Sequence, residues 1–375
     1  FIAFHLISGV LIPFFVDWGG LEFVEIMFLQ SYFTTMILVF EIPCGAISDY
    51  ISKKFSLILG AIVNTFATLV YSIYPHIILF VLGETLWAFS AALISGTDES
   101  LIYKSLRKQG KENKISVKTA RMRAFALLGI GISAPFGSLI AEYISLNAVM
   151  FYMMIPFIGA AIISLTIKEP NHDLKEVEKQ KYLDIIKSGF KELRYNKILR
   201  VLAFEFVSVQ AIVFFIIWTY QLYLEQIGVI LAFFGFFSAL MTFTQILIIN
   251  LIPSVEKRYK NKRLFIQLYT LIPAVAFILM AFVSYIPISI LLILLVIGFG
   301  FSRSILFVNG INRQIQTENR ATALSTINMI TSLVQALFYP LIGYLVMWNL
   351  NATFIVLGIA ILMVIALSRI KNEYI

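Results

Sequence analysis

Long apolar stretches alternate with short polar ones along the whole chain. Cutting the sequence at its polar residues leaves twelve apolar segments, each long enough to cross the hydrocarbon core of a membrane, about 30 Å, as an α-helix. We place these segments near residues 1–17, 21–44, 55–74, 77–103, 119–141, 147–168, 198–222, 228–252, 264–284, 287–311, 322–347 and 351–368. The pattern predicts an all-α polytopic membrane protein with twelve transmembrane helices. The chain opens inside an apolar segment, so we expect its native N-terminus to be missing.

The composition supports a membrane location. Of the 375 residues, 60% are hydrophobic and 13% are charged, whereas soluble domains carry about 25% charged residues. The single cysteine, Cys44, excludes an intramolecular disulfide and a cysteine-based metal site. The sequence has no group of His, Cys or Asp at ligand spacing and no G-x-x-x-x-G-K-S/T loop. We therefore expect no enzyme chemistry, no metal, no cofactor and no nucleotide-driven pump.

Positive charge follows the same alternation. All but one of the 29 Lys and Arg residues lie in, or at the edge of, the polar stretches that follow every second apolar segment; the exception is Arg303. The other connecting loops hold acidic residues instead, namely Asp17, Glu22, Glu142 and Glu225. Because Lys and Arg concentrate on the cytoplasmic side, we expect both termini inside, in a multi-pass protein of the cytoplasmic membrane. Charge dispersed over several loops also argues against a nucleic-acid partner.

The longest polar stretch, residues 169–197, divides the chain into two six-segment halves, residues 1–168 and 198–375. Within it, four apolar residues recur at helical spacing, with Lys and Arg on the other faces: Leu183, Ile186, Phe190 and Leu193. This spacing predicts a cytoplasmic linker containing an amphipathic helix that lies on the membrane surface. We interpret the linker as a tether between the halves.

A polar turn between the second and third segments has a distinctive pattern. Gly45 precedes Asp49 by four residues, and the pair Lys53 and Lys54 follows. Glycine permits a close approach of two backbones, and an aspartate can accept hydrogen bonds from backbone N–H groups at a nearby helix N-terminus. The lysines would hold the turn on the cytoplasmic side. The alternative is an ordinary charged loop between two helices.

This turn resembles the signature loop between helices two and three of major facilitator superfamily transporters, whose pattern is roughly G-x-x-x-D-x-x-G-R/K-R/K. Gly45, Asp49, Lys53 and Lys54 match it, whereas Tyr50 replaces the usual basic residue and a serine replaces the second glycine. A weaker echo of the turn follows the eighth segment, as expected of two related halves. The resemblance implies a major facilitator fold of two six-helix bundles, which moves a small-molecule substrate by alternating access as a monomer. It gives the turn a gating role.

Charged side chains inside membrane helices cost several kcal/mol unless they are paired or hydrated, so each marks a candidate site. Besides Arg303, those in the predicted segments are Glu41, Glu84, Asp98, Glu99 and Glu205. A buried arginine needs a carboxylate partner. We predict that Arg303 pairs with Glu205 or with the Asp98–Glu99 pair. This pair could break during transport, or it could be a permanent structural bridge or a gate.

The fourth segment carries three of these acids. As one continuous helix it would present a ladder of polar and aromatic side chains on one face, formed by Glu84, Trp87, Ser95 and Asp98. Trp87 could stack on an apolar or cationic substrate. Asp98 and Glu99 could equally cap the inner end of the helix pair.

Two further features bear on proton coupling. Glu41, which precedes Pro43 by two residues, could carry a proton, since a carboxylate removed from water can titrate near neutral pH; the alternative is a structural hydrogen bond to a facing helix. Small residues around Pro135 resemble a degraded glycine–proline motif of drug:proton antiporters, although close helix packing explains them equally well. The arginine that many family antiporters are thought to use in helix four has no match near Glu84.

We therefore expect a secondary active transporter coupled to protons. Our first choice is an antiporter for multidrug-like efflux of an amphipathic or cationic compound, because the candidate cavity helices are rich in acids and aromatic residues. The alternative is proton- or ion-coupled uptake of a small metabolite, with Arg303 holding an anionic group.

Overall fold

Helices make up nearly all of the chain that the structure describes. The computed structural model describes residues 2–170, 182–256, 258–314 and 320–374, and these ranges contain no β-strand. The chain forms two compact units, Phe1–Lys179 with Ile230–Ala239, and Gln180–Val229 with Leu240–Ile375. Within the described ranges, eleven helical stretches are long and apolar enough to cross a membrane. The all-α membrane class is confirmed, whereas a twelfth spanning helix is not.

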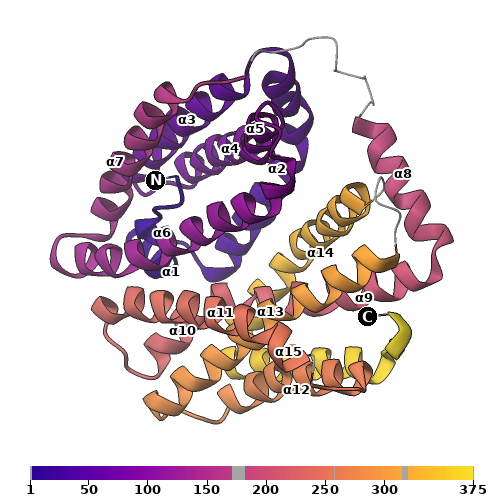
Figure 1. Ribbon diagram of the computed structural model, residues 1–375. Helices are drawn as coiled ribbons and strands as arrows, with labels where there is room; N and C mark the ends of the chain where they lie inside the picture. The colour runs from indigo at the N-terminus through magenta and orange to yellow at the C-terminus, as the bar shows by residue number, and fades with distance from the viewer. Residues whose placement is uncertain (1, 171–181, 257, 315–319, 375) are drawn as a thin grey trace. The chain divides into compact units, whose positions relative to one another are not determined.

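The first unit contains five of the long helical stretches (Figure 1). Its elements are η1 (Leu6–Gly9), α1 (Leu11–Pro13), the π-helical turn η2 (Phe14–Trp18), α2 (Phe23–Tyr50), α3 (Lys53–Ile73), α4 (Ile77–Ile94), α5 (Thr97–Arg107), η3 (Glu112–Lys114), α6 (Ile115–Tyr143), α7 (Leu146–Thr166) and η5 (Leu231–Phe233). The predicted polar turn is shorter than expected. Because α2 remains helical to Tyr50, only Ile51 and Ser52 separate it from α3.

The stretch predicted as the first membrane helix is not one helix. Residues 6–18 form three short helical pieces, η1, α1 and η2. Val10 breaks the helix between the first two with a non-helical backbone, φ −135° and ψ 27°. Pro13 lacks the N–H that would continue an α-helical ladder. The side chains of this stretch nevertheless belong to the core, since Val10 and Phe14 are completely buried.

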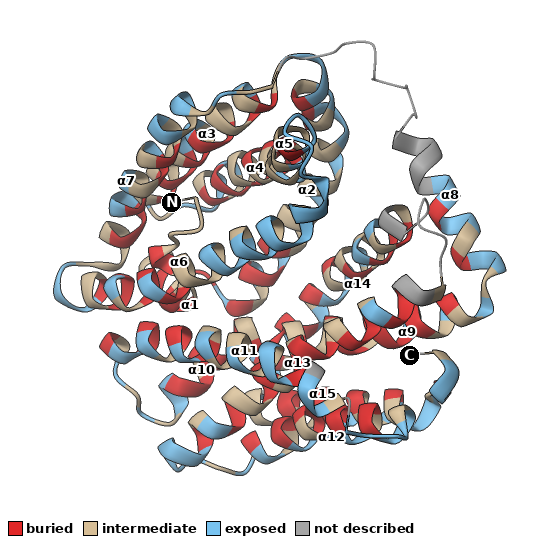
Figure 2. Cartoon of the chain, viewed as in Figure 1, coloured by how far each residue is buried: buried red, intermediate tan, exposed pale blue. Residues whose placement is uncertain are grey.

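The second unit contains the remaining helices (Figure 1). They are α8 (Tyr182–Tyr195), α9 (Lys197–Phe214), α10 (Ile216–Gln226), α11 (Phe234–Glu256, whose first residues belong to the first unit), α12 (Lys262–Met280), α13 (Ile286–Gln314), α14 (Arg320–Trp348), α15 (Leu350–Leu367) and η7 (Asn372–Tyr374). Its core joins α9, α12 and α13 through Leu202, Ile266 and Phe307. Buried positions run along α9 and α13 in Figure 2.

The amphipathic helix predicted in the linker is present as α8. Its Leu193 packs into the core of the second unit, and Gly189 lies directly against Thr326 of α14. The first part of the predicted linker, residues 171–181, lies outside the described residues. The position of α8 on a membrane surface stays a prediction.

Local signals in the sequence begin several helices. Asn196, Asn261 and Asn349 each cap a helix by accepting a hydrogen bond from the backbone N–H three residues later, at 3.0, 3.0 and 2.8 Å, as capping asparagines do. The outward faces of the long helices are apolar: Phe66 is 57% exposed and Leu337 is 76% exposed. Lipid is the solvent such faces require.

Candidate functional site

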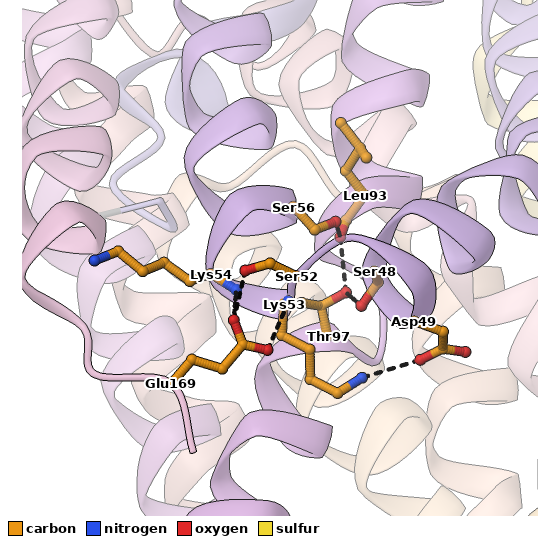
Figure 3. Close-up of polar contacts among 9 residues, drawn as sticks. All are labelled: Ser48, Asp49, Ser52, Lys53, Lys54, Ser56, Leu93, Thr97 and Glu169. Atoms are coloured by element: carbon orange, nitrogen blue, oxygen red, sulfur yellow. Dashed lines mark hydrogen bonds and ion pairs between the residues drawn. The ribbon is translucent and has the colours of Figure 1, made fainter. Parts of the chain in front are cut away.

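The turn between α2 and α3 is held by an ion pair. The ammonium of Lys53 lies 3.1 Å from the carboxylate of Asp49, one helical turn earlier (Figure 3). Lys53 is almost fully buried, with 3% of its side chain exposed, whereas Asp49 is 56% exposed. The aspartate therefore supplies the charge that compensates a buried cation. Lys54 donates instead to the carbonyl oxygen of Leu165 in α7, at 2.6 Å.

A carboxylate that the sequence analysis did not single out caps the same turn. Glu169, three residues beyond α7, accepts hydrogen bonds from the Ser52 hydroxyl at 2.5 Å, the Lys53 backbone N–H at 2.9 Å and the Lys54 backbone N–H at 3.1 Å (Figure 3). An acidic group at a helix N-terminus satisfies unpaired N–H donors and complements the helix dipole. The task expected of Asp49 at a helix N-terminus is thus performed at α3 by Glu169. Its position directly after the sixth apolar segment was the available signal.

Hydroxyl groups tie the turn to the next helices. Ser48 of α2 accepts a hydrogen bond of 3.0 Å from Thr97 of α5, and Thr97 also contacts the carbonyl oxygen of Leu93 at 2.9 Å. Ser56 of α3 donates to the same carbonyl at 2.7 Å (Figure 3). The close backbone approach expected at Gly45 is not present, because a Cβ at this position would meet no atom within 4 Å.

Glu84 lies in the interior of the first unit with two uncharged partners. Its side chain is buried, with 5% of the residue exposed, and it accepts a hydrogen bond of 2.8 Å from the Gln30 amide of α2. The Tyr71 hydroxyl of α3 is its second hydrogen-bonding partner. Glu84 forms no ion pair within the described residues. A membrane-embedded carboxylate in such surroundings is a candidate for proton transfer.

Trp87 lies one turn from Glu84 and packs among other aromatic rings. Its ring meets those of His5 and Phe157 edge-on, at centroid distances of 5.7 and 6.1 Å, and that of Tyr71 at 6.1 Å. Edge-to-face pairs of this kind stabilise a core. The role of Trp87 in stacking on a substrate stays a prediction.

The predicted ladder of side chains along one continuous fourth helix is wrong. The helix α4 ends at Ile94, Gly96 takes a left-handed backbone with φ +68°, and α5 begins at Thr97. The helical register of Glu84 therefore does not continue to Asp98. Gly96 is the residue type that adopts this conformation without strain.

Asp98 and Glu99 occupy the first turn of α5, where acidic residues favour the helix dipole. The Asp98 carboxylate accepts the Glu99 backbone N–H at 2.7 Å. Glu99 pairs with Arg123 of α6 at 2.8 Å, and both side chains are well exposed. These contacts match the capping alternative.

Arg303 pairs with Glu205, which is one of the two partners that the sequence predicted. The guanidinium donates to the Glu205 carboxylate and to the Glu205 backbone carbonyl, both at 2.8 Å, and to the Thr270 hydroxyl at 2.7 Å. It also lies 4.2 Å from the centre of the Phe307 ring. Both charged side chains are only 3% exposed. The second carboxylate oxygen of Glu205 is buried without a hydrogen-bonding partner among the described residues.

The remaining two features lie within helices of the first unit. Glu41 is partly buried in α2, two residues before Pro43, and its role stays a prediction. The stretch around Pro135 packs closely: a Cβ on Gly137 would overlap the backbone of Leu6, and Ser138 donates to the carbonyl oxygen of Ala232 at 2.8 Å. The helix-packing interpretation of this stretch is confirmed.

Comparison with known proteins places these features in context. A family model described as Major Facilitator Superfamily matches residues 1–311. The uncharacterized MFS-type transporter YxaM of Bacillus subtilis (strain 168) is 24% identical over 247 residues, which span 64% of this chain and 60% of that relative. Similar solved structures include the nucleoside transporter NupG (TM-score 0.76, 15% identity, 99% of this chain and 97% of that one). They also include the D-xylose-proton symporter (TM-score 0.75, 12% identity, 100% and 95%).

Proposed function

Because the chain belongs to the major facilitator superfamily, we propose that it is a secondary active transporter that couples the movement of a small organic solute to a proton carried by Glu84. One observation carries the proton assignment: Glu84 is buried in a membrane-spanning helix with only uncharged hydrogen-bonding partners. An uncompensated charge in this position is costly. A change in its exposure during alternating access would therefore be linked to uptake or release of a proton.

The partners of Glu84 suit both protonation states. The Gln30 side chain has an N–H₂ donor and a carbonyl acceptor, and a tyrosine hydroxyl can also donate or accept. With Glu84 charged, both partners donate to it, as in the observed arrangement. With Glu84 protonated, rotation of the Gln30 amide would present an acceptor to the new O–H group. The Glu84 carboxyl thus has hydrogen-bonding partners available in both protonation states.

The other embedded charges support different roles. Arg303 and Glu205 compensate each other, and the guanidinium is already occupied by three hydrogen bonds. We assign this pair to the structure of the second unit. An anionic substrate held by Arg303 would have to displace Glu205, so the geometry does not favour that alternative. Asp98 and Glu99 form the first turn of α5.

We assign the turn residues Gly45, Asp49, Lys53 and Lys54 to gating. The support is the match of these residues to the family pattern and the ion pair between the buried Lys53 ammonium and the exposed Asp49 carboxylate at the junction of α2 and α3. This ion pair joins the last turn of α2 to the first residue of α3 across the two-residue turn. Movement of either helix during alternating access would require this pair to rearrange.

A transport assay can identify the class of solute. The comparisons do not support efflux of an amphipathic compound, and the similar folds are named as transporters of a nucleoside and of D-xylose with a proton. We therefore place neutral hydrophilic solutes beside cationic ones as candidates. The test uses the full chain in proteoliposomes that enclose a pH-sensitive dye. The panel contains a nucleoside, D-xylose, a quaternary ammonium compound and a dicarboxylate.

A proton-coupled transporter will give a dye response to at least one solute, and an imposed pH gradient will drive accumulation of that solute. The response should vanish in liposomes without protein. Solute movement that ignores the pH gradient would contradict proton coupling. If the folded protein moved none of these solutes, the proposal that its solute belongs to one of these classes would be wrong.

A further inference from the structure

A groove in the second unit lies between the beginning of α9 and the end of α15. Its volume is about 1080 Å³. Four basic residues line it: Lys197 and Arg200 in the first turn of α9, and Arg369 and Lys371 just beyond α15. The two spanning stretches that border the groove begin at Lys197 and end at Leu367. The groove therefore lies at the edge of the apolar layer, at the depth of lipid headgroups.

Apolar residues line the same groove further inside the two helices. Val201 and Phe204 line it from α9, and Ala366 and Leu367 from α15. Phe204 is 51% exposed and Leu367 is 66% exposed. The groove thus has a cationic end and an apolar end that is open to the surroundings. A soluble anion would need only the cationic end, whereas a lipid would use both ends.

Most of the positive charge in the groove is uncompensated. Lys197, Arg200 and Arg369 form no ion pair within the described residues, and Lys371 lies 3.7 Å from Glu373 on the surface. The acidic residue that lines the groove, Glu205, is already paired with Arg303 at 2.8 Å.

Helix stability does not account for two of these cations. Basic residues are unfavourable at a helix N-terminus, where Lys197 and Arg200 lie. Membrane insertion favours cations in this region of the chain. It does not require cations from two segments more than 150 residues apart in sequence to line one groove.

We propose that this groove binds an anionic phospholipid. The phosphate contacts the basic residues, and an acyl chain lies along Phe204 and Leu367. Guanidinium groups bind phosphate oxygens through paired hydrogen bonds, and basic pockets between membrane helices suit anionic headgroups. This inference is independent of the transported solute.

The test measures lipid binding to the purified full chain by native mass spectrometry in detergent. The probes are dioleoyl phosphatidylglycerol, dioleoyl phosphatidylcholine and inorganic phosphate. The groove variant is Arg200→Gln with Arg369→Gln. The matched control, Arg258→Gln with Arg263→Gln, removes two exposed arginines with the same change in net charge, one between α11 and α12 and one in the first turn of α12. Thermal unfolding of all three proteins shows whether they are equally folded.

We expect the wild type to bind phosphatidylglycerol in preference to phosphatidylcholine. The groove variant should bind it about thirtyfold more weakly, since each cation near an anionic lipid surface contributes about fivefold, and the control should bind as the wild type does. Equal loss in both variants would show a general charge effect and overturn the proposal. So would competition by inorganic phosphate at equal concentration, which would identify a site for a soluble anion, or a lack of lipid preference in the wild type.

Discussion

Two buried ionisable groups in this chain differ in how their charge is compensated. Arg303 has a carboxylate, a carbonyl and a hydroxyl as partners, and its charge is balanced by Glu205. Glu84 has an amide and a phenol as partners, neither of which carries charge. A buried charge with an oppositely charged partner tends to keep its protonation state. The protonation state of a buried acid without such a partner depends on whether water reaches it. On this contrast rests our proposal that the first group stabilises the fold and the second transfers a proton.

Removing one member of the buried pair should destabilise the second unit. We expect Arg303→Met to lower the free energy of unfolding by about 3–5 kcal/mol, because Glu205 would keep a buried charge without a partner. Adding Glu205→Leu should restore much of the loss, since apolar side chains can replace a buried ion pair. Denaturant unfolding in detergent, followed by tryptophan fluorescence, measures both. Wild-type stability of Arg303→Met would contradict a structural role.

At the residue scale, the sequence predicted the partner of one buried charge, as one of two alternatives, but not the partners of the other. The pairing of Arg303 with Glu205 could be predicted because a buried arginine requires an acid and few acids were available. Glu169 was missed because it lies at the start of a long polar stretch, where acidic residues are ordinary. Gln30 and Tyr71 reach Glu84 from two other helices. The spacing of residues along one helix does not predict which residues of another helix it contacts.

At the scale of single elements, the break between α4 and α5 changes the interpretation of the fourth segment. The stretch Ser95-Gly96-Thr97-Asp98 combines a glycine that can end a helix with an acidic first turn that can begin one. These signals are short, and the apolar pattern on both sides continues through them. The backbone preference of Gly96 therefore sets the break between α4 and α5, which the apolar pattern alone does not show.

Two glycines provide a matched test of this break. Gly96→Ala should cost about 1–2 kcal/mol, because an alanine at φ +68° is strained. Gly45→Ala lies in regular α2 with open space around it, so stability should stay unchanged or rise by up to about 1 kcal/mol. Unfolding of both variants in detergent measures the difference. If Gly96→Ala were the more stable of the two, the left-handed break would be wrong.

The N-terminus of α3 depends on a residue from beyond α7. Glu169→Gln should speed hydrogen exchange at the backbone amides of Lys53 and Lys54 about fivefold, since loss of a helix cap costs about 1 kcal/mol. Mass spectrometry of peptides from this turn gives the rates. The matched control is Glu142→Gln, an exposed acid at the end of α6. Equal rates in wild type and Glu169→Gln would contradict Glu169 as the cap of α3.

At the scale of the whole molecule, the alternation of apolar and polar stretches predicted the helical membrane class, and one turn predicted the family. The match over residues 1–311 confirms the family. Residues 1–17 were apolar enough to be predicted as a helix, yet a backbone break at Val10 and the lack of an N–H at Pro13 divide them into short pieces. Hydrophobicity measures the preference for lipid, but it does not show where the backbone of a segment bends.

The most direct test of the central claim compares the wild type with Glu84→Gln and the control Glu142→Gln in proteoliposomes, using the panel solute that the wild type moves fastest. Two rates are measured: accumulation driven by a pH gradient, and exchange of labelled for unlabelled solute at equal pH. We predict that Glu84→Gln loses accumulation and the dye response but retains exchange, because binding and alternating access need no titrating acid. The control should retain both. Accumulation by Glu84→Gln at the wild-type rate would contradict Glu84 as the proton carrier.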